Sequence, residues 1–131
     1  MSPTLKILVA EDDRVSRLIF QRTFETNAAF ADHDVNVLLA SDGKEALEQF
    51  LEQHPHLVIV DLLMPKLDGF ELCRSIRESP HGRHVPIIAT SALWKSRDVL
   101  ELLKNDFQVE FIAKPIEVAD LVALALLVLK S

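Results

Sequence analysis

Five short apolar runs, each about the length of a β-strand, recur along the chain with helical segments between them. The runs cover residues 6–10, 36–40, 57–60, 85–90 and 110–113. Continuous apolar runs are typical of strands that a parallel sheet buries on both faces, whereas half-exposed strands alternate apolar and polar residues. Apolar spacing predicts helices over residues 14–27, 44–52, 70–78, 95–105 and 117–130. Strand–helix units in series predict an α/β fold, with an open parallel sheet and helices on both faces.

Local signals support several of the helix boundaries. Ser41-Asp42-Gly43 forms a turn and cap before the second helix. Asp68-Gly69 is a turn before the third helix, which stops before Pro80. In the last helix we expect Glu117 in the first turn and Lys130 in the last, where the helix dipole favours these charges. In the first helix, four residues have the spacing of a core-facing stripe: Ile19, Phe20, Thr23 and Phe24.

The composition fits one compact domain and disfavours several classes of protein. A chain of 131 residues, of which 49% are hydrophobic, can bury one core, so we expect a single domain over residues 1–131. The net charge of -6 argues against direct nucleic-acid binding. The lone cysteine, Cys73, excludes an internal disulfide and suits a cytoplasmic location. The N-terminus lacks a signal-peptide pattern, and the longest apolar run, 121–129, is shorter than the roughly 20 residues that span a membrane.

Acidic residues follow two of the predicted strands. Glu11-Asp12-Asp13 comes after the first apolar run, and Asp61 ends the third. In open parallel sheets, ligands bind at the carboxyl ends of the strands, so these carboxylates converge if the two strands are neighbours. Mutual repulsion makes such a cluster costly, and a divalent cation with hard oxygen ligands, such as Mg²⁺, relieves it. The alternative is that the acidic triplet only caps the first helix, and Asp61 shifts the balance toward a site.

Four motifs then occur in order along the chain. They are Ile7 to Asp12, residues 55–69 with Asp61 and Met64-Pro65, residues 86–92, and Phe111-Ile112-Ala113-Lys114-Pro115. Together they resemble the response-regulator receiver family over residues 5–129. The resemblance implies a flavodoxin-like, doubly wound fold with five helices and the strand order 2-1-3-4-5. It also implies a phosphoacceptor in a two-component phosphorelay, a signalling switch and not an enzyme.

The resemblance assigns the central chemistry to Asp61, the nucleophile that forms an aspartyl phosphate. Mg²⁺ is the implied cofactor, and the implied ligands are Glu11, Asp12, Asp61 and the backbone carbonyl of Leu63. Phosphoryl transfer needs an in-line nucleophile and positive charge around the equatorial oxygens, with little covalent chemistry from the protein. Mg²⁺ and Lys114 would supply that charge in a preorganised crevice.

Four further residues receive roles from the same resemblance. Ser91 would hydrogen-bond a phosphoryl oxygen, and alignment favours it over Thr90, which then points into the sheet. Lys114 would pair with Asp61 or with the phosphoryl group. Phe111 would change rotamer on activation, and Pro115 would follow a cis peptide bond.

Other reactive side chains receive structural interpretations. Asp13 is a helix cap first and a metal neighbour second. Cys73 lies mid-helix and is more consistent with packing than with chemistry. Four histidines match no strong zinc signature and are expected to be solvated in loops: His54, His56, His81 and His84.

Some stretches depart from the family pattern. Residues 26–35 form a longer connection than usual, and residues 105–110 lack the usual Gly-Ala-Asp turn. Leu63 and Leu93 occupy positions that in the family tune dephosphorylation by placing the attacking water. Because leucine cannot hydrogen-bond that water, we expect slow self-dephosphorylation.

Two helices carry apolar residues beyond those needed for a core stripe. The last helix is apolar almost all round, which predicts an exposed apolar patch. The patch suggests a homodimer through the fourth helix, fifth strand and fifth helix, or a neighbouring domain in a longer protein. Val15 and Leu18 of the first helix should lie near the site, where the family docks its phosphodonor, a histidine kinase or histidine phosphotransfer protein.

Three other functions compete with the receiver interpretation. A haloacid-dehalogenase-like phosphatase also uses a strand-terminal Asp and Mg²⁺, but needs a second Asp where Leu63 stands. A flavodoxin-type flavin carrier needs a Ser/Thr/Gly-rich phosphate loop where Glu11-Asp12-Asp13 would repel phosphate. A binding-only pseudo-receiver would not need the full set of Glu11, Asp12, Asp61, Ser91 and Lys114.

Overall fold

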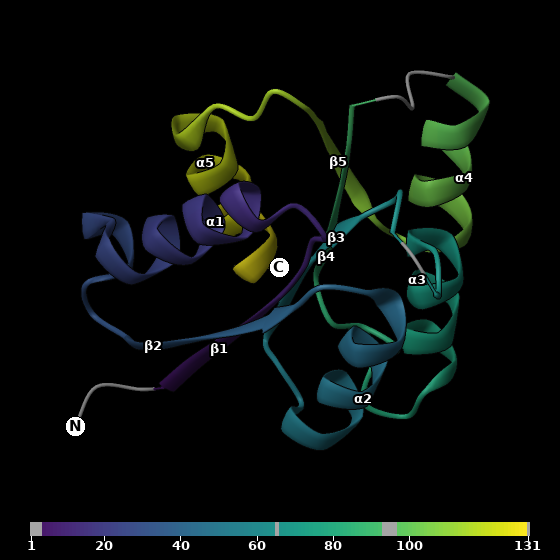
Figure 1. Ribbon diagram of the computed structural model, residues 1–131, viewed down its shortest axis with the longest axis horizontal. Helices are drawn as coiled ribbons and strands as arrows, with labels where there is room; N and C mark the ends of the chain where they lie inside the picture. The colour runs from purple at the N-terminus through teal and green to yellow at the C-terminus, as the bar shows by residue number, and fades with distance from the viewer. Residues whose placement is uncertain (1–3, 65, 93–96, 131) are drawn as a thin grey trace.

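A computed structural model describes residues 4–64, 66–92 and 97–130. It contains a parallel five-stranded sheet in the order β2-β1-β3-β4-β5 (Figure 1), so the predicted fold and strand order are confirmed. The strands are β1 (Thr4–Ala10), β2 (Asp34–Ala40), β3 (Leu57–Asp61), β4 (Ile87–Ser91) and β5 (Glu110–Ala113). The helices are α1 (Arg14–Thr26), α2 (Gly43–Gln53), α3 (Gly69–Glu78), α4 (Arg97–Asp106) and α5 (Val118–Leu129), with a short 3₁₀ helix η1 (Ala28–Phe30).

Helices cover both faces of the sheet. α1 and α5 lie together on one face, and α2, α3 and α4 cover the other (Figure 1). Side chains of each strand alternate between the two resulting cores: Leu8 and Val58 join one, and Ile7 and Ile59 join the other. Burial on both faces explains why the strand sequences are continuously apolar.

The described strand and helix boundaries lie within two residues of the prediction. β4 begins at Ile87, not at Val85, because Pro86 lacks the N–H that a central strand donates to its neighbour. Its carbonyl still accepts a hydrogen bond of 3.0 Å from the Val58 N–H. α4 is described from Arg97 onward, so the predicted start at Lys95 lies outside the described residues. After α4, Gln108 adopts the left-handed conformation with φ 55°, a turn made without glycine.

Aspartates cap three of the helices. The side chains of Asp13, Asp42 and Asp68 accept backbone N–H bonds at the starts of α1, α2 and α3. The caps predicted at Asp13 and Asp42 are confirmed, and Asp68, predicted as part of a turn, is a cap as well. The prediction was one residue off at both ends of α5. Glu117 is the N-cap, without a side-chain bond to the helix, and Lys130 is the C-cap.

The core stripe of α1 is narrower than predicted. Phe20, Thr23 and Phe24 are buried, but the side chain of Ile19 is 51% exposed. Neighbouring helical positions are about 100° apart, so Ile19 turns out of the core when Phe20 faces it. The predicted exposure of Val15 and Leu18 is confirmed. The long connection after α1 contains η1, whose Phe30 packs edge-on against Phe24.

The apolar helix α5 is only partly exposed. Leu121, Val122 and Ala125 are buried against the sheet, while Val118 is 44% and Leu127 is 64% exposed. Four further side chains are half-buried at the edge of the core, so the patch is smaller than the sequence suggested: Leu124, Leu126, Val128 and Leu129. Within the described part of the chain, every helix is too short or too polar to cross a membrane.

Candidate functional site

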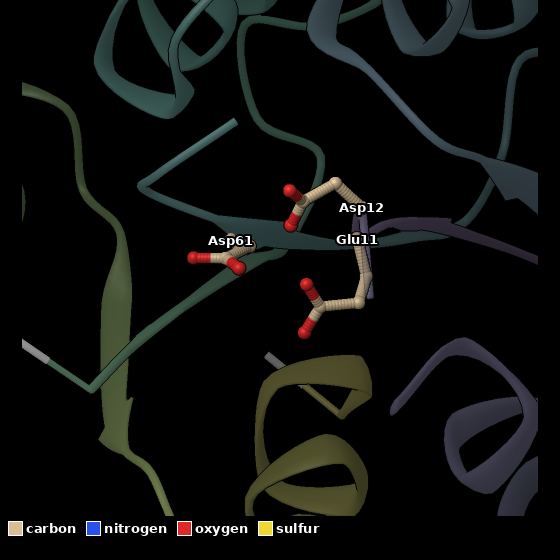
Figure 2. Close-up of side chains that lie close together, drawn as sticks. All are labelled: Glu11, Asp12 and Asp61. Carbon is tan, nitrogen blue, oxygen red and sulfur yellow. The ribbon is translucent and has the colours of Figure 1, made fainter. Parts of the chain in front are cut away.

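Three carboxylates meet at the carboxyl ends of β1 and β3. These strands are neighbours in register, with Ala10 opposite Val60, so the next residues, Glu11 and Asp61, lie at the same level. One oxygen from each of Glu11, Asp12 and Asp61 lies within 4.8 Å of the other two. Figure 2 shows the three carboxyl groups gathered around a common space. The structure therefore brings together the three acids that the sequence nominated for a metal.

The three acids differ in burial. The side chains of Glu11 and Asp61 are buried, and Asp12 is exposed. Desolvation by burial is the main cause that raises the pKa of Glu11 from 4.5 to about 7, and hydrogen bonding with Asp61 adds to the increase. A carboxyl group that is costly to ionise beside a second carboxylate gains most from a nearby cation. The electrostatics of the cluster thus favour a positively charged ligand.

Lys114 reaches the cluster from the residue after β5. Its Nζ donates to Asp61 Oδ2 at 3.1 Å and also forms an ion pair with Glu11 Oε1. Burial alone would lower the pKa of Lys114, but its bonds to Glu11 and Asp61 outweigh that effect and raise the pKa. The sequence predicted the contact with Asp61 and missed the one with Glu11. The Lys114–Pro115 peptide bond is cis, as the resemblance implied.

Both carboxylate oxygens of Asp61 have partners. Oδ1 accepts the backbone N–H of Leu63 at 3.0 Å, and Oδ2 accepts from Lys114. This arrangement fixes the rotation of the carboxylate at the end of a buried strand. The carbonyl of Leu63, predicted as a metal ligand, belongs to the same loop, two residues after Asp61.

Ser91 ends β4, and Phe111 lies on the neighbouring strand β5. Ser91 is the last residue of β4 and is fully buried; its carbonyl accepts the Lys114 N–H at 3.1 Å. Phe111 is half-buried and packs against the core on the α2–α3–α4 face. Thr90 pairs with Asp61 across the strands and is buried, as expected for a residue that points into the sheet. Its hydroxyl has no hydrogen-bond partner among the described residues.

The family model described as response regulator receiver domain matches residues 7–126. The chain belongs to this family. "Probable transcriptional regulator ycf27" of Porphyridium aerugineum is 41% identical over 108 residues, which are 80% of this chain and 41% of that protein. "Uncharacterized 14.6 kDa protein in sodA1 3'region" of Leptolyngbya boryana is 32% identical over 92% of this chain and 86% of its own length.

Solved receiver domains share the fold. The receiver domain of the sensor histidine kinase PA1611 from Pseudomonas aeruginosa PAO1 has a TM-score of 0.82 at 27% identity. The match covers 98% of this chain and 99% of that one, and that structure holds a magnesium ion in its active-site cleft.

In this receiver domain, the loop after Asp61 is tied to the start of α2. A Cβ on Gly43 would lie 1.8 Å from the carbonyl oxygen of Leu67, so only glycine permits this approach. Lys66, which has φ 70°, extends its Nζ to within 3.5 Å of Asp42. Sequence patterns did not indicate either contact, because both join segments that are distant along the chain.

Among the other reactive side chains of the receiver domain, Asp13 adjoins this cluster, and its N–H donates to Glu11 Oε2 at 3.3 Å. Asp13 accepts from the Ser16 N–H as a cap. Cys73 is buried in α3, and burial raises the pKa of its thiol to about 12, which makes it unreactive. The four histidines that the sequence placed in loops are all exposed. Leu63 is 39% exposed beside Asp61, whereas Leu93 lies outside the described residues.

Proposed function

We propose that this receiver domain is the phosphoacceptor of a two-component phosphorelay, with Asp61 as the residue that is phosphorylated. The observation that carries the proposal is the position of Asp61, buried at the end of β3 between two further carboxylates and Lys114. The donor would be a histidine kinase or a histidine phosphotransfer protein in the cytoplasm. The domain would act as a switch and not as an enzyme, without direct contact to nucleic acid or membrane.

Glu11, Asp12 and Asp61 are suited to hold Mg²⁺. They offer hard, anionic oxygens within 4.8 Å of one another, which is the donor set that Mg²⁺ prefers. The carbonyl of Leu63 would complete the protein ligands. When bound, Mg²⁺ would neutralise charge on the incoming phosphoryl oxygens.

Asp61 and the residues around the acids have separate roles in the proposed phosphoryl transfer. An oxygen of Asp61 attacks the phosphorus of the donor phosphohistidine, the P–N bond breaks, and its electron pair stays on the imidazole, which takes up a proton. Lys114 moves from the free carboxylates to the phosphoryl oxygens, and Ser91 donates a hydrogen bond to one of them. Phe111 lies on the neighbouring strand and would change rotamer as Ser91 moves, passing the change to a partner surface.

Intact-protein mass after incubation with acetyl phosphate and Mg²⁺ tests this proposal. We expect one phosphoryl adduct on the wild type and none on Asp61→Asn or on wild type without Mg²⁺. Asp68→Asn is the matched control, because Asp68 caps α3 and asparagine caps a helix equally well. Absence of an adduct on the wild type under every condition would refute phosphorylation and favour a binding-only domain.

We further propose that the phosphorylated domain is long-lived. The exposed side chain of Leu63 cannot hydrogen-bond a water near Asp61, and Leu93 is assigned the same property from the sequence. The adduct should therefore persist well beyond seconds, and Leu63→Asn should shorten its lifetime. A wild-type half-life of only seconds would contradict this expectation.

Donor docking would use the exposed apolar side chains of α1. Val15 and Leu18 are exposed, and Ile19 lines an apolar cavity of about 230 Å³ beside Lys114. Val15→Asp should slow transfer from a phosphorylated donor protein while leaving acetyl phosphate reactivity unchanged. Equal transfer rates from the donor protein would contradict this docking surface.

Dimerisation through α4, β5 and α5 is the proposed output contact. Leu102 on α4 and Leu127 on α5 are exposed apolar side chains that support it. Light scattering should show a larger mass for the phosphorylated protein than for the unphosphorylated one. A phosphorylated protein that stays monomeric would refute the dimer.

A further inference from the structure

The backbone that carries Glu11 and Asp12 is held by a side chain from α1. Arg17 Nη1 donates to the carbonyl oxygen of Glu11 at 2.8 Å and to that of Asp12 at 2.9 Å. Arg17 is half-buried and belongs to the first turn and a half of α1. One guanidinium nitrogen thus bridges two consecutive peptide groups of the acidic loop.

The rest of the loop is fixed from other directions. The Glu11 N–H donates to the Ala40 carbonyl on β2 at 3.0 Å. The side chain of Asp13 accepts from the N–H and the hydroxyl of Ser16 and caps α1 without the Arg17 guanidinium. Arg17 therefore supplies the bonds that orient the carbonyls of Glu11 and Asp12, while the helix start has its own cap. Orienting these peptides directs both side chains toward Asp61.

The contacts of Arg17 differ from those of Lys114. Lys114 donates to the carboxylate oxygens themselves, so it occupies positions that a metal ion would need. Arg17 donates to the backbone carbonyls of Glu11 and Asp12 instead, so these bonds leave the carboxylate oxygens unoccupied. A side chain that orients metal ligands in this way changes the affinity of the site for the metal without contacting the metal itself.

We propose that Arg17 is a positioning residue that sets the divalent-cation affinity of the acidic site by holding the Glu11 and Asp12 backbone. This inference rests on the proposed function, since it assumes that the three acids bind Mg²⁺. It assigns no contact between Arg17 and the metal or the phosphoryl group.

The test is a titration of the folded protein with MgCl₂ at constant ionic strength, followed by backbone amide NMR shifts. Arg17→Gln should raise the Kd for Mg²⁺ by about 10-fold or more, the range found for outer partners of metal ligands. Arg17→Lys keeps the charge but not the planar fork, so its Kd should lie between those of Arg17→Gln and wild type. Arg14→Gln is the matched control, because Arg14 is exposed on the same helix and its loss should change the Kd by less than about 2-fold.

Phosphorylation by acetyl phosphate gives a second readout. Arg17→Gln should shift the Mg²⁺ concentration for half-maximal rate by the same factor as the Kd and leave the rate at saturating Mg²⁺ unchanged. A fall in the saturating rate alone, without a change in Kd, would overturn the proposal.

The outcomes separate this inference from the proposed function. If wild type binds Mg²⁺ and Arg17→Gln binds it equally well, the Arg17 proposal is wrong and the proposed function stands. Equal losses in Arg17→Gln and Arg14→Gln would show a general charge effect and also overturn it. If wild type binds no Mg²⁺, both fail together. Should Arg17→Gln be unfolded by circular dichroism, Arg17→Lys carries the test, and a wild-type Kd in that variant would refute the role.

Discussion

The two ends of the sheet differ in how their charged groups are held. At the carboxyl end, Glu11 and Asp61 are buried and bonded to Lys114. The amino end holds the histidines, all five of which precede β2, β3 or β4 in the chain. They are exposed, and most of them line an open cavity of about 900 Å³.

Arg77 and Lys114 differ in the groups to which they donate. At the amino end its guanidinium donates to the carbonyls of Phe107, Gly82, Val85 and Gln108, at 2.7 to 3.1 Å. It therefore joins α3 to the segments that lead into β4 and β5. At the carboxyl end Lys114 donates to carboxylates that are expected to change partners. At the amino end Arg77 bonds to the backbone of the fold, and under the proposed function Lys114 at the carboxyl end is held in position for phosphoryl transfer.

Replacing Lys114, the basic side chain at the carboxyl end, should have the largest functional effect. Lys114→Met should slow phosphorylation by acetyl phosphate about 100-fold or more, as expected when a donor to transition-state charge is lost. Mg²⁺ binding should persist, because Lys114 bonds to the same carboxylates that would hold the ion. Rates come from adduct formation by mass, and Lys104→Met, an exposed lysine on α4, is the control. A phosphorylation rate of Lys114→Met within a few-fold of the wild-type rate would contradict the functional role assigned to Lys114.

Replacing Arg77, the basic side chain at the amino end, should instead lower the stability of the fold. Arg77→Met leaves four carbonyls without their charged donor, so the free energy of unfolding should fall by about 2–4 kcal/mol. Urea denaturation measures the change, with Arg74→Met, an exposed arginine on the same helix, as control. The Kd for Mg²⁺ should stay at the wild-type value. A large change in that Kd with little loss of stability would show that Arg77 acts on the metal site and not on the fold.

The fold and the acids were predictable because their signals are local. Apolar runs mark buried strands, and an acid that follows a strand, such as Glu11 or Asp61, must lie at the carboxyl edge of a parallel sheet. Caps such as Asp42 also follow from short-range chemistry. The strand order was predicted from the resemblance to the receiver family. The carboxylate cluster was predicted from the acids that follow the ends of two strands.

The contacts of long basic side chains were not predictable in this way. Arg17 and Arg77 look like solvated helix residues in sequence, because a pattern of apolar spacing cannot show which carbonyls a guanidinium reaches. The bond from Lys114 to Glu11 depends on side-chain reach from the end of β5 past β4 and β3 to the end of β1. Ile19 was misassigned because an apolar residue beside Phe20 fits the hydrophobic pattern of α1 although it faces away from the core.

The buried acid Glu11 should make the carboxyl end sensitive to pH. Its pKa is about 7 in the folded protein, against the ordinary value of 4.5 in the unfolded chain. Between these values the folded state binds more protons than the unfolded state, so stability should fall as pH rises from 4.5 to about 7. We expect a loss of about 3 kcal/mol, measured by urea denaturation without Mg²⁺.

Glu11→Gln is the matched variant for this prediction. Glutamine resembles the protonated carboxyl group in shape and charge, so this part of the pH dependence should disappear. Added Mg²⁺ should stabilise wild type more at pH 8 than at pH 5.5, because the ion competes with the proton for Glu11. A wild-type profile that rises over the same interval would contradict the direction of the pKa change.

The smallest expected effect lies at the amino end, in the histidine that precedes β3. His56 Nδ1 accepts the Lys6 N–H at 2.9 Å, and the His56 N–H donates to the Lys6 carbonyl at 2.8 Å. His56→Ala removes one exposed acceptor and should lower the free energy of unfolding by about 0.5–1 kcal/mol. His56→Asn keeps an acceptor at a similar position and should lose less. Urea denaturation of the two variants checks this order, and phosphorylation should be unchanged in both. A slower phosphorylation rate in His56→Ala would mean that the two ends of the sheet are coupled, which the separation of their charged groups does not predict.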